Sequence, residues 1–169
     1  MIRAWPVAAL LLALLIGFWL VGGDSVSASD RGLLAPLAPL EGTWTDGSGE
    51  TRSFVWAEAE QGLVESRRST EGSLLETTTY FWHPDRNEGA GSLALVGIAS
   101  DGAVREGILR QDPDAGLELR FNSFAVEGGG GSFRERLRWL DDGRMLRTLH
   151  QRGGDSEVLV AEEILEPVK

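Results

Sequence analysis

The chain has 169 residues, which is enough for one domain with a sizeable core and too few for two. Its formal net charge of -10 repels phosphate backbones and argues against nucleic acid as a partner. There are no cysteines, which excludes disulfides, thiolate metal sites, cysteine nucleophiles and a lipoprotein anchor.

Residues 1–28 are typical of a targeting segment. Arg3 supplies a positive start, residues 5–23 form an uncharged apolar run, and Val26-Ser27-Ala28 offers small residues that a signal peptidase accepts. The run approaches the roughly 20 residues that span a bilayer, so it serves either as a removed signal peptide or as a retained membrane anchor. We favour removal. Both alternatives place the domain outside the cytoplasm, in the periplasm or secreted.

Residues 29–41 form a linker in which four leucines recur at near-helical spacing around two prolines. The leucines are Leu33, Leu34, Leu37 and Leu40, and the prolines are Pro36 and Pro39. This pattern predicts a single helical turn that plugs one end of the domain that follows.

Residues 42–166 have the pattern of consecutive strands joined by tight turns, and most of the 22 glycines stand where a turn is expected. The expected strands are residues 51–59, 63–70, 74–82, 91–99, 103–111, 117–126, 132–140, 144–152 and 157–165, with one more short strand at Trp44. No stretch supplies the helical crossover that parallel pairing needs. The sequence therefore predicts an all-β, antiparallel up-and-down barrel of about 8–10 strands, closed because an open meander leaves two exposed edges.

Alternation in the later strands separates an inner from an outer face. Apolar side chains share one face at Leu117, Leu119 and Phe121, and at Phe133, Leu137 and Trp139. Three arginines share the opposite face, at positions 134, 136 and 138. Charged side chains on a strand usually face solvent, so these arginines indicate a solvated outer stripe, with an anion site as the alternative.

Glu135 is a carboxylate on the predicted apolar face, where an unpaired charge would be strongly unfavourable. If Asp141-Asp142-Gly143 is a three-residue loop, Arg147 falls on the same face, diagonal to Glu135 and within reach of an ion pair. The pair would either tie two strands together or serve as a polar anchor at the bottom of a ligand cavity. The sequence leaves both alternatives open.

Aromatic side chains of one parity recur in the earlier strands. Trp56 shares a face with Phe54, and Tyr80 and Trp82 share a face with Glu76 and Thr78. Aromatic residues at this spacing are commonly plain core, and they would also line any cavity that exists.

Gly42-Thr43-Trp44, a Gly-x-Trp at the start of the first strand after a short helical plug, resembles the opening motif of lipocalins. Tyr80-Phe81-Trp82-His83-Pro84, followed by Ser100-Asp101-Gly102, is similar to lipocalin-like domains of uncharacterised secreted bacterial proteins. The resemblance implies a calycin-type barrel that holds a small hydrophobic ligand in its mouth. It also implies that Trp44 packs across one end of that barrel.

The favoured function is a binding barrel for a small hydrophobic molecule. Its expected ligand-binding residues are Trp56, Tyr80, Trp82, Phe121, Glu135, Leu137, Trp139 and Arg147. No metal ligand is expected, because His83 and His150 stand far apart without zinc-site spacing. The sequence matches no catalytic motif, and no cofactor is expected. Two alternatives remain: an isomerase or hydratase that uses Glu135 or His150 as acid–base, and a filled barrel that acts as an accessory interaction domain.

Overall fold

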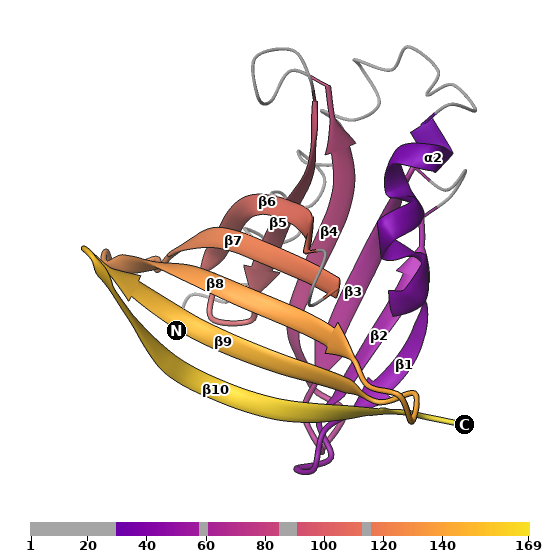
Figure 1. The fold of residues 1–169 in the computed structure, drawn as a ribbon. Coiled ribbons are helices and arrows are strands. Elements are labelled where there is room, and N and C mark those ends of the chain that lie inside the picture. The colour runs from indigo at the N-terminus through magenta and orange to yellow at the C-terminus, as the bar shows by residue number, and fades with distance from the viewer. Residues whose placement is uncertain (1–29, 58–60, 85–90, 113–115) are drawn as a thin grey trace.

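The structure, a computed structural model, describes residues 30–57, 61–84, 91–112 and 116–169. Ten strands form a closed antiparallel barrel in which each strand pairs with its neighbours in the chain, and β1 and β10 pair to close it (Figure 1). The barrel expected from the sequence is confirmed. The predicted signal or anchor segment lies outside the described residues.

The barrel is preceded by two short helices, α2 (Asp30–Leu34) and the 3-10 helix η1 (Ala35–Leu40). The first five strands are β1 (Gly42–Thr45), β2 (Thr51–Trp56), β3 (Gly62–Arg68), β4 (Leu74–His83) and β5 (Ser92–Ala99). The other five are β6 (Val104–Asp112), β7 (Gly116–Phe124), β8 (Gly130–Trp139), β9 (Met145–Gly153) and β10 (Ser156–Pro167). All nine expected strands and the short strand at Trp44 are present, and they differ from expectation only at their ends.

The turn between β8 and β9 fixes the register of the strands on either side of it. The Leu140 N–H donates to the Arg144 carbonyl at 2.8 Å, and the Gly143 N–H donates back to the Leu140 carbonyl at 3.1 Å. Gly143 has a φ of +82°, a left-handed conformation that favours glycine. Leu137 therefore pairs with Arg147, as expected for a three-residue loop.

The linker helices close one end of the barrel, beside β4 in Figure 1. Leu34, Leu37 and Leu40 are at most 2% exposed and pack into the barrel core. The Trp44 indole N–H donates to the Leu40 carbonyl at 2.9 Å, which ties the first strand to the plug. Where a single helical turn was expected, two consecutive short helices occur, and they bury three of the four predicted leucines, whereas Leu33 is 37% exposed.

The inward-facing side chains change in character along the barrel. Those nearest the plug are apolar and form one core cluster that includes Leu63, Leu117 and Met145. Further from the plug, the same faces of the strands carry charged residues that are nevertheless buried, such as Glu65 on β3 and Arg147 on β9. The interior is thus divided into an apolar layer beneath the helices and a charged layer beyond it.

Candidate functional site

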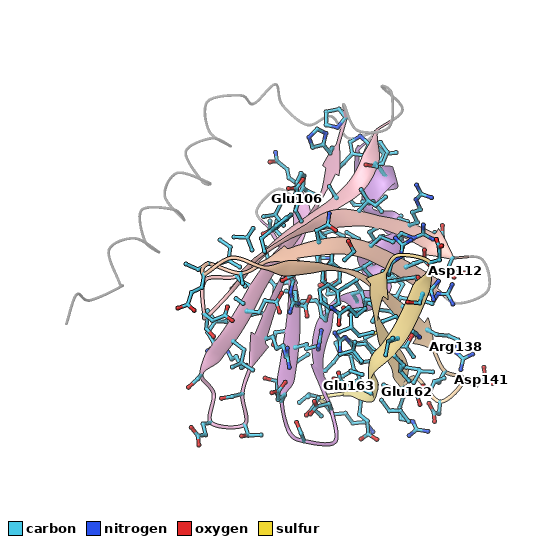
Figure 2. All side chains as sticks on the ribbon, turned by 90° about the vertical axis from the view of Figure 1, so that its left-hand side faces the viewer. Glu106, Asp112, Arg138, Asp141, Glu162 and Glu163 are labelled. Carbon is cyan, nitrogen blue, oxygen red and sulfur yellow. The ribbon has the colours of Figure 1, made fainter. Side chains whose placement is uncertain are left out.

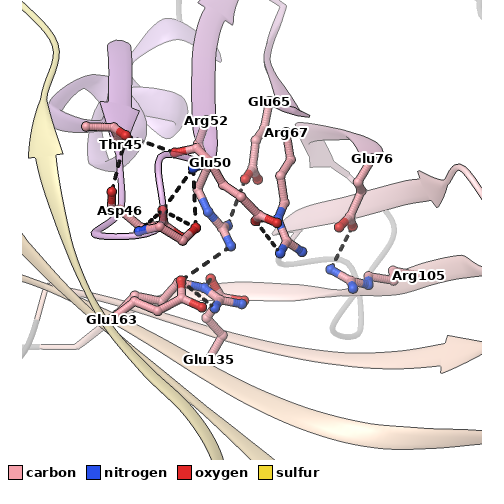
Figure 3. A network of polar contacts seen from close by, with 12 residues as sticks. Thr45, Asp46, Glu50, Arg52, Glu65, Arg67, Glu76, Arg105, Glu135 and Glu163 are labelled. Carbon is pink, nitrogen blue, oxygen red and sulfur yellow. Dashed lines mark hydrogen bonds and ion pairs between the residues drawn. The ribbon is translucent and has the colours of Figure 1, made fainter. Parts of the chain in front are cut away.

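The charged layer contains a network of ion pairs that crosses the barrel interior (Figure 3). Arg52 Nη1 on β2 donates to Glu65 Oε1 on β3 at 3.0 Å. The Tyr80 hydroxyl on β4 donates to the other oxygen of Glu65 at 2.6 Å. Glu65 is therefore held from two sides, by a guanidinium and by a phenol.

The network continues on the opposite wall. Arg147 on β9 donates from Nε and Nη2 to both oxygens of Glu135 on β8, at 2.7 and 3.1 Å. Its Nη1 also donates to Glu163 Oε2 on β10 at 3.1 Å. Glu163 lies 3.8 Å from Arg52 as well, so it joins the two walls into one network.

The Glu135–Arg147 pair is strongly ionised. Burial alone would raise the pKa of Glu135, but the charge and hydrogen bonds of Arg147 outweigh burial and lower it from 4.5 to about 2. Burial opposes the charge on Arg147 as well, yet the carboxylate raises the pKa of the guanidinium above its ordinary value. The pKa of Tyr80 lies well above its ordinary value because of burial and the adjacent Glu65 charge. Tyr80 is therefore a hydrogen-bond donor at neutral pH.

A second ion pair lies towards the other side of the interior. Glu76 on β4 accepts from Arg105 on β6 at 2.7 Å, across the intervening strand β5. Burial raises the pKa of Glu76, and the positive charge of Arg105 offsets that effect only in part. The Arg105 guanidinium also lies over the Phe121 ring, 5.4 Å from its centroid, which is within cation–π range.

The adjacent arginines Arg67 and Arg68 on β3 face opposite sides of the strand. Arg67 donates from Nε and Nη2 to Glu50 Oε2 at 2.9 and 2.6 Å and is half-buried. Arg68 is exposed and donates to the Gly72 carbonyl at 3.0 Å. Arg67 therefore lies on the inner face, at the same parity as Glu65.

The contacts of Glu135 and the position of His150 bear on the alternative that one of these residues is the acid–base group of an enzyme. A carboxylate with a pKa of about 2, held at both oxygens, is ionised at neutral pH and poorly suited to exchange protons with a substrate. His150 stands on the outer face of β9, opposite Arg134 on β8, whereas Glu135 points inward. The two candidate acid–base residues therefore do not converge on one site, and the geometry favours the structural interpretation of the Glu135–Arg147 pair.

A groove of about 480 Å³ lies at the plugged end of the barrel, and we call it the plug groove. It is lined by Gly32, Ala35, Pro36 and Pro39 from the helices and by Gln111, Gly116, Leu117 and Trp139 from the ends of β6, β7 and β8. None of these eight residues carries a charge. Gly116, with a φ of +98°, packs against the Trp139 ring, and a Cβ at that position would lie 2.6 Å from Trp139 Cζ3.

Of the eight expected ligand-binding residues, Trp139 lines the plug groove. Glu135 and Arg147 bind each other in the charged layer, and Tyr80 binds Glu65 there. Leu137 is 3% exposed and belongs to the core cluster.

The remaining three expected residues make separate contacts. The Trp56 indole donates to Glu41 Oε2 at 3.1 Å. The Trp82 ring lies directly against Gly91. Phe121 stacks on Phe133 with centroids 5.4 Å apart. The structure therefore does not gather the eight residues into one cavity wall.

Several charged interior residues were not anticipated, although a sequence signal for them exists. Arg52 lies on the same face of its strand as Phe54 and Trp56, and Glu65 lies on the same face as Leu63. The alternation rule that predicted an inward Glu135 therefore predicts that these two charged residues face inward as well. The plug groove has no such signal. It arises where the helices meet the strand ends, which alternation within a strand does not describe.

Among the described residues, no helix is long and apolar enough to cross a membrane. Within the same part of the chain, no three histidine, aspartate or glutamate side chains come together as a metal site. No protein-family model and no curated protein matches this sequence. The kinship with lipocalins therefore stays a resemblance, while the closed antiparallel barrel that it implies is observed.

Proposed function

We propose that this protein binds a small, uncharged and largely apolar molecule in the plug groove. The observation that carries the proposal is the groove itself, a depression of about 480 Å³ at the plugged end of a closed barrel, whose described lining residues carry no charge. Ligand sites in proteins are concave and mostly apolar, with volumes of roughly 300–1,000 Å³. Its wall combines an aromatic ring, Trp139, with two prolines, Pro36 and Pro39.

The charged layer supports an apolar ligand at the barrel end over one deep inside the barrel. Glu65, Glu135 and Arg147 already satisfy one another and their neighbours through short hydrogen bonds. An apolar molecule inserted among them would separate buried ion pairs and leave charges without partners. Apolar surface in the plug groove can be covered without breaking any of these contacts.

We also place this binding outside the cytoplasm, in a lipocalin-like protein that is exported or anchored. The apolar run at residues 5–23 and the small residues before Ser29 support that location.

The first experiment is native mass spectrometry of the full-length protein purified from the cells that export it. A small molecule that leaves on denaturation would identify the ligand class. Gln111→Trp is the matched test variant, because Gln111 is exposed and lines the groove, so a tryptophan there should fill the groove without disturbing the core. Gln151→Trp, at an exposed site on β9 that does not line this groove, is the control.

We expect the ligand to be lost from Gln111→Trp and retained by Gln151→Trp. A ligand that both variants retain equally would contradict binding in the plug groove. A clean apo mass for the unmodified protein, with no stabilisation by a panel of fatty acids and terpenoids, would favour a filled barrel that acts through its surface.

A further inference from the structure

A second groove, of about 320 Å³, lies across the outer face of β6 to β9, and we call it the outer groove. The strand registers place its polar residues in adjacent rungs, meaning rows of paired residues that run across neighbouring strands. One rung runs from Glu106 through Asn122 and Ser132 to Arg152. Arg120 and Ile108 pair on the next outer rung, so two arginines from strands separated only by β8 border the same groove.

Two carboxylates beside the outer groove are each shared by two arginines. Glu118 is shared by two arginines, accepting from Arg120 at 2.6 Å and from Arg136 at 3.1 Å. Glu157 is shared in the same way by Arg134 and by Arg152, the latter at 3.2 Å. Each guanidinium carries five N–H donors, so a carboxylate that serves two arginines leaves many donors on this face for another acceptor.

One further donor has spare capacity. The Ser132 hydroxyl donates to Asn122 Oδ1 at 2.7 Å, which leaves the amide nitrogen of Asn122 to donate elsewhere. This outer face is therefore rich in donors in a protein whose net charge is -10.

We propose that the outer groove binds a small oxyanion, a carboxylate or phosphate group, between Arg120 and Arg152. Strands two apart in a sheet are separated by about 10 Å, and an anion between Arg120 and Arg152 would be bound by the N–H donors that Glu118 and Glu157 leave unused. The shared glutamates hold the two guanidiniums in place through charge-assisted hydrogen bonds. Glu106 stands at the β6 end of the rung and repels an anion there, which confines the anion to the β7–β9 side.

The ligand is a single small anion and not an extended polyanion. The acidic net charge opposes the approach of a nucleic acid, whereas a small anion experiences chiefly the local arginines. The groove shares no lining residue with the plug groove, so this proposal stands independently of the proposed function.

The test is an NMR titration of the isotope-labelled full-length protein, in which the backbone amides of Asn122 and Ser132 are followed. Inorganic phosphate and succinate are added separately, and the tighter of the two identifies the source of the oxyanion. We expect saturable shifts at these amides. Arg120→Gln and Arg152→Gln should each weaken binding about tenfold or more, as expected for the loss of a charge-assisted hydrogen bond.

Two further variants distinguish specific binding at this site from nonspecific attraction of the anion to positively charged side chains. Arg152→Lys keeps the charge and loses the planar fork, so it should bind more weakly than the unmodified protein and more tightly than Arg152→Gln. Arg138→Gln is the matched control, because Arg138 lies on the same outer face of β8 but well apart from Glu106 in Figure 2. Equal weakening by Arg138→Gln, or no saturable shift with either anion, would overturn the proposal.

Discussion

Glu135 and Arg147 form a bidentate ion pair inside the barrel, with N–O distances of 2.7 and 3.1 Å, that joins β8 to β9. Their side chains are 8% and 5% exposed, so neither charge has ready access to water. Removal of one partner from a buried pair leaves the other charge uncompensated. We therefore expect Arg147→Met to lower the free energy of unfolding by about 3–5 kcal/mol in urea denaturation followed by tryptophan fluorescence.

Two comparisons show whether this loss comes from the unpaired charge. Arg144→Met removes an arginine whose partner, Asp142, is exposed, and it should leave stability nearly unchanged because surface pairs contribute little. The double variant Glu135→Leu with Arg147→Met removes both charges and should recover much of the lost stability. A double variant as unstable as Arg147→Met alone would show that packing, and not charge, causes the loss.

The low pKa of Glu135 predicts a loss of stability in acid. Its pKa is about 2 in the folded state and 4.5 when unperturbed, so the unfolded chain binds a proton more readily than the folded one. The stabilisation is therefore fully present above about pH 4.5 and is lost as the pH falls towards 2. Urea denaturation across this range should show the loss in the unmodified protein and a smaller loss in Glu135→Gln. Parallel acid profiles for the two proteins would contradict this assignment.

The pair itself could be predicted from the sequence because every step towards it is local. Alternation places Glu135 on the inner face, and the three-residue turn fixes which residues of β9 lie opposite β8. By contrast, the contact between Arg52 and Glu163 joins β2 to β10, on either side of β1 in the closed barrel. Its geometry depends on barrel closure, which no short stretch of sequence encodes.

The plug groove could not be predicted from the sequence, for a related reason. Trp139 was expected to line a cavity because it faces inward, but the groove wall also needs Pro36 and Pro39 from the helices. Where the helices lie depends on how Leu34 and Leu37 pack into the barrel end, a tertiary contact. The sequence thus predicts which side chains face inward more reliably than which of them remain accessible to a ligand.

Glu76 should respond to pH in the sense opposite to Glu135. Because burial raises the pKa of Glu76 in the folded state, the folded protein holds this proton more readily than the unfolded chain does. The favourable contribution of the protonated form is present below about pH 4.5 and is lost as the pH rises through the folded-state pKa. Glu76→Gln, which mimics the protonated form, should therefore be at least as stable as the unmodified protein at pH 7.

The stability difference between Glu76→Gln and the unmodified protein should shrink as the pH falls below 4.5, measured by urea denaturation at each pH. Glu135→Gln is the internal contrast, since it should be less stable than the unmodified protein at pH 7. If Glu76→Gln proved much less stable at pH 7, the contact with Arg105 would outweigh the burial of charge.

Gly97 has no side chain, and this leaves room for the ion pair between Glu76 and Arg105. It lies on β5, between the strands that carry the two charges, and a Cβ there would lie 2.6 Å from Thr78 Oγ1 and 3.3 Å from Glu76 Oε1. Gly97→Ala should therefore displace Thr78 and, to a smaller extent, Glu76, and lower the free energy of unfolding by about 1–3 kcal/mol, as overpacking does. Gly153→Ala is the control, because a Cβ there meets nothing within 4 Å. Thr78→Ala added to Gly97→Ala removes the closest clash and should restore part of the loss in urea denaturation; no restoration would place the strain in the β5 backbone.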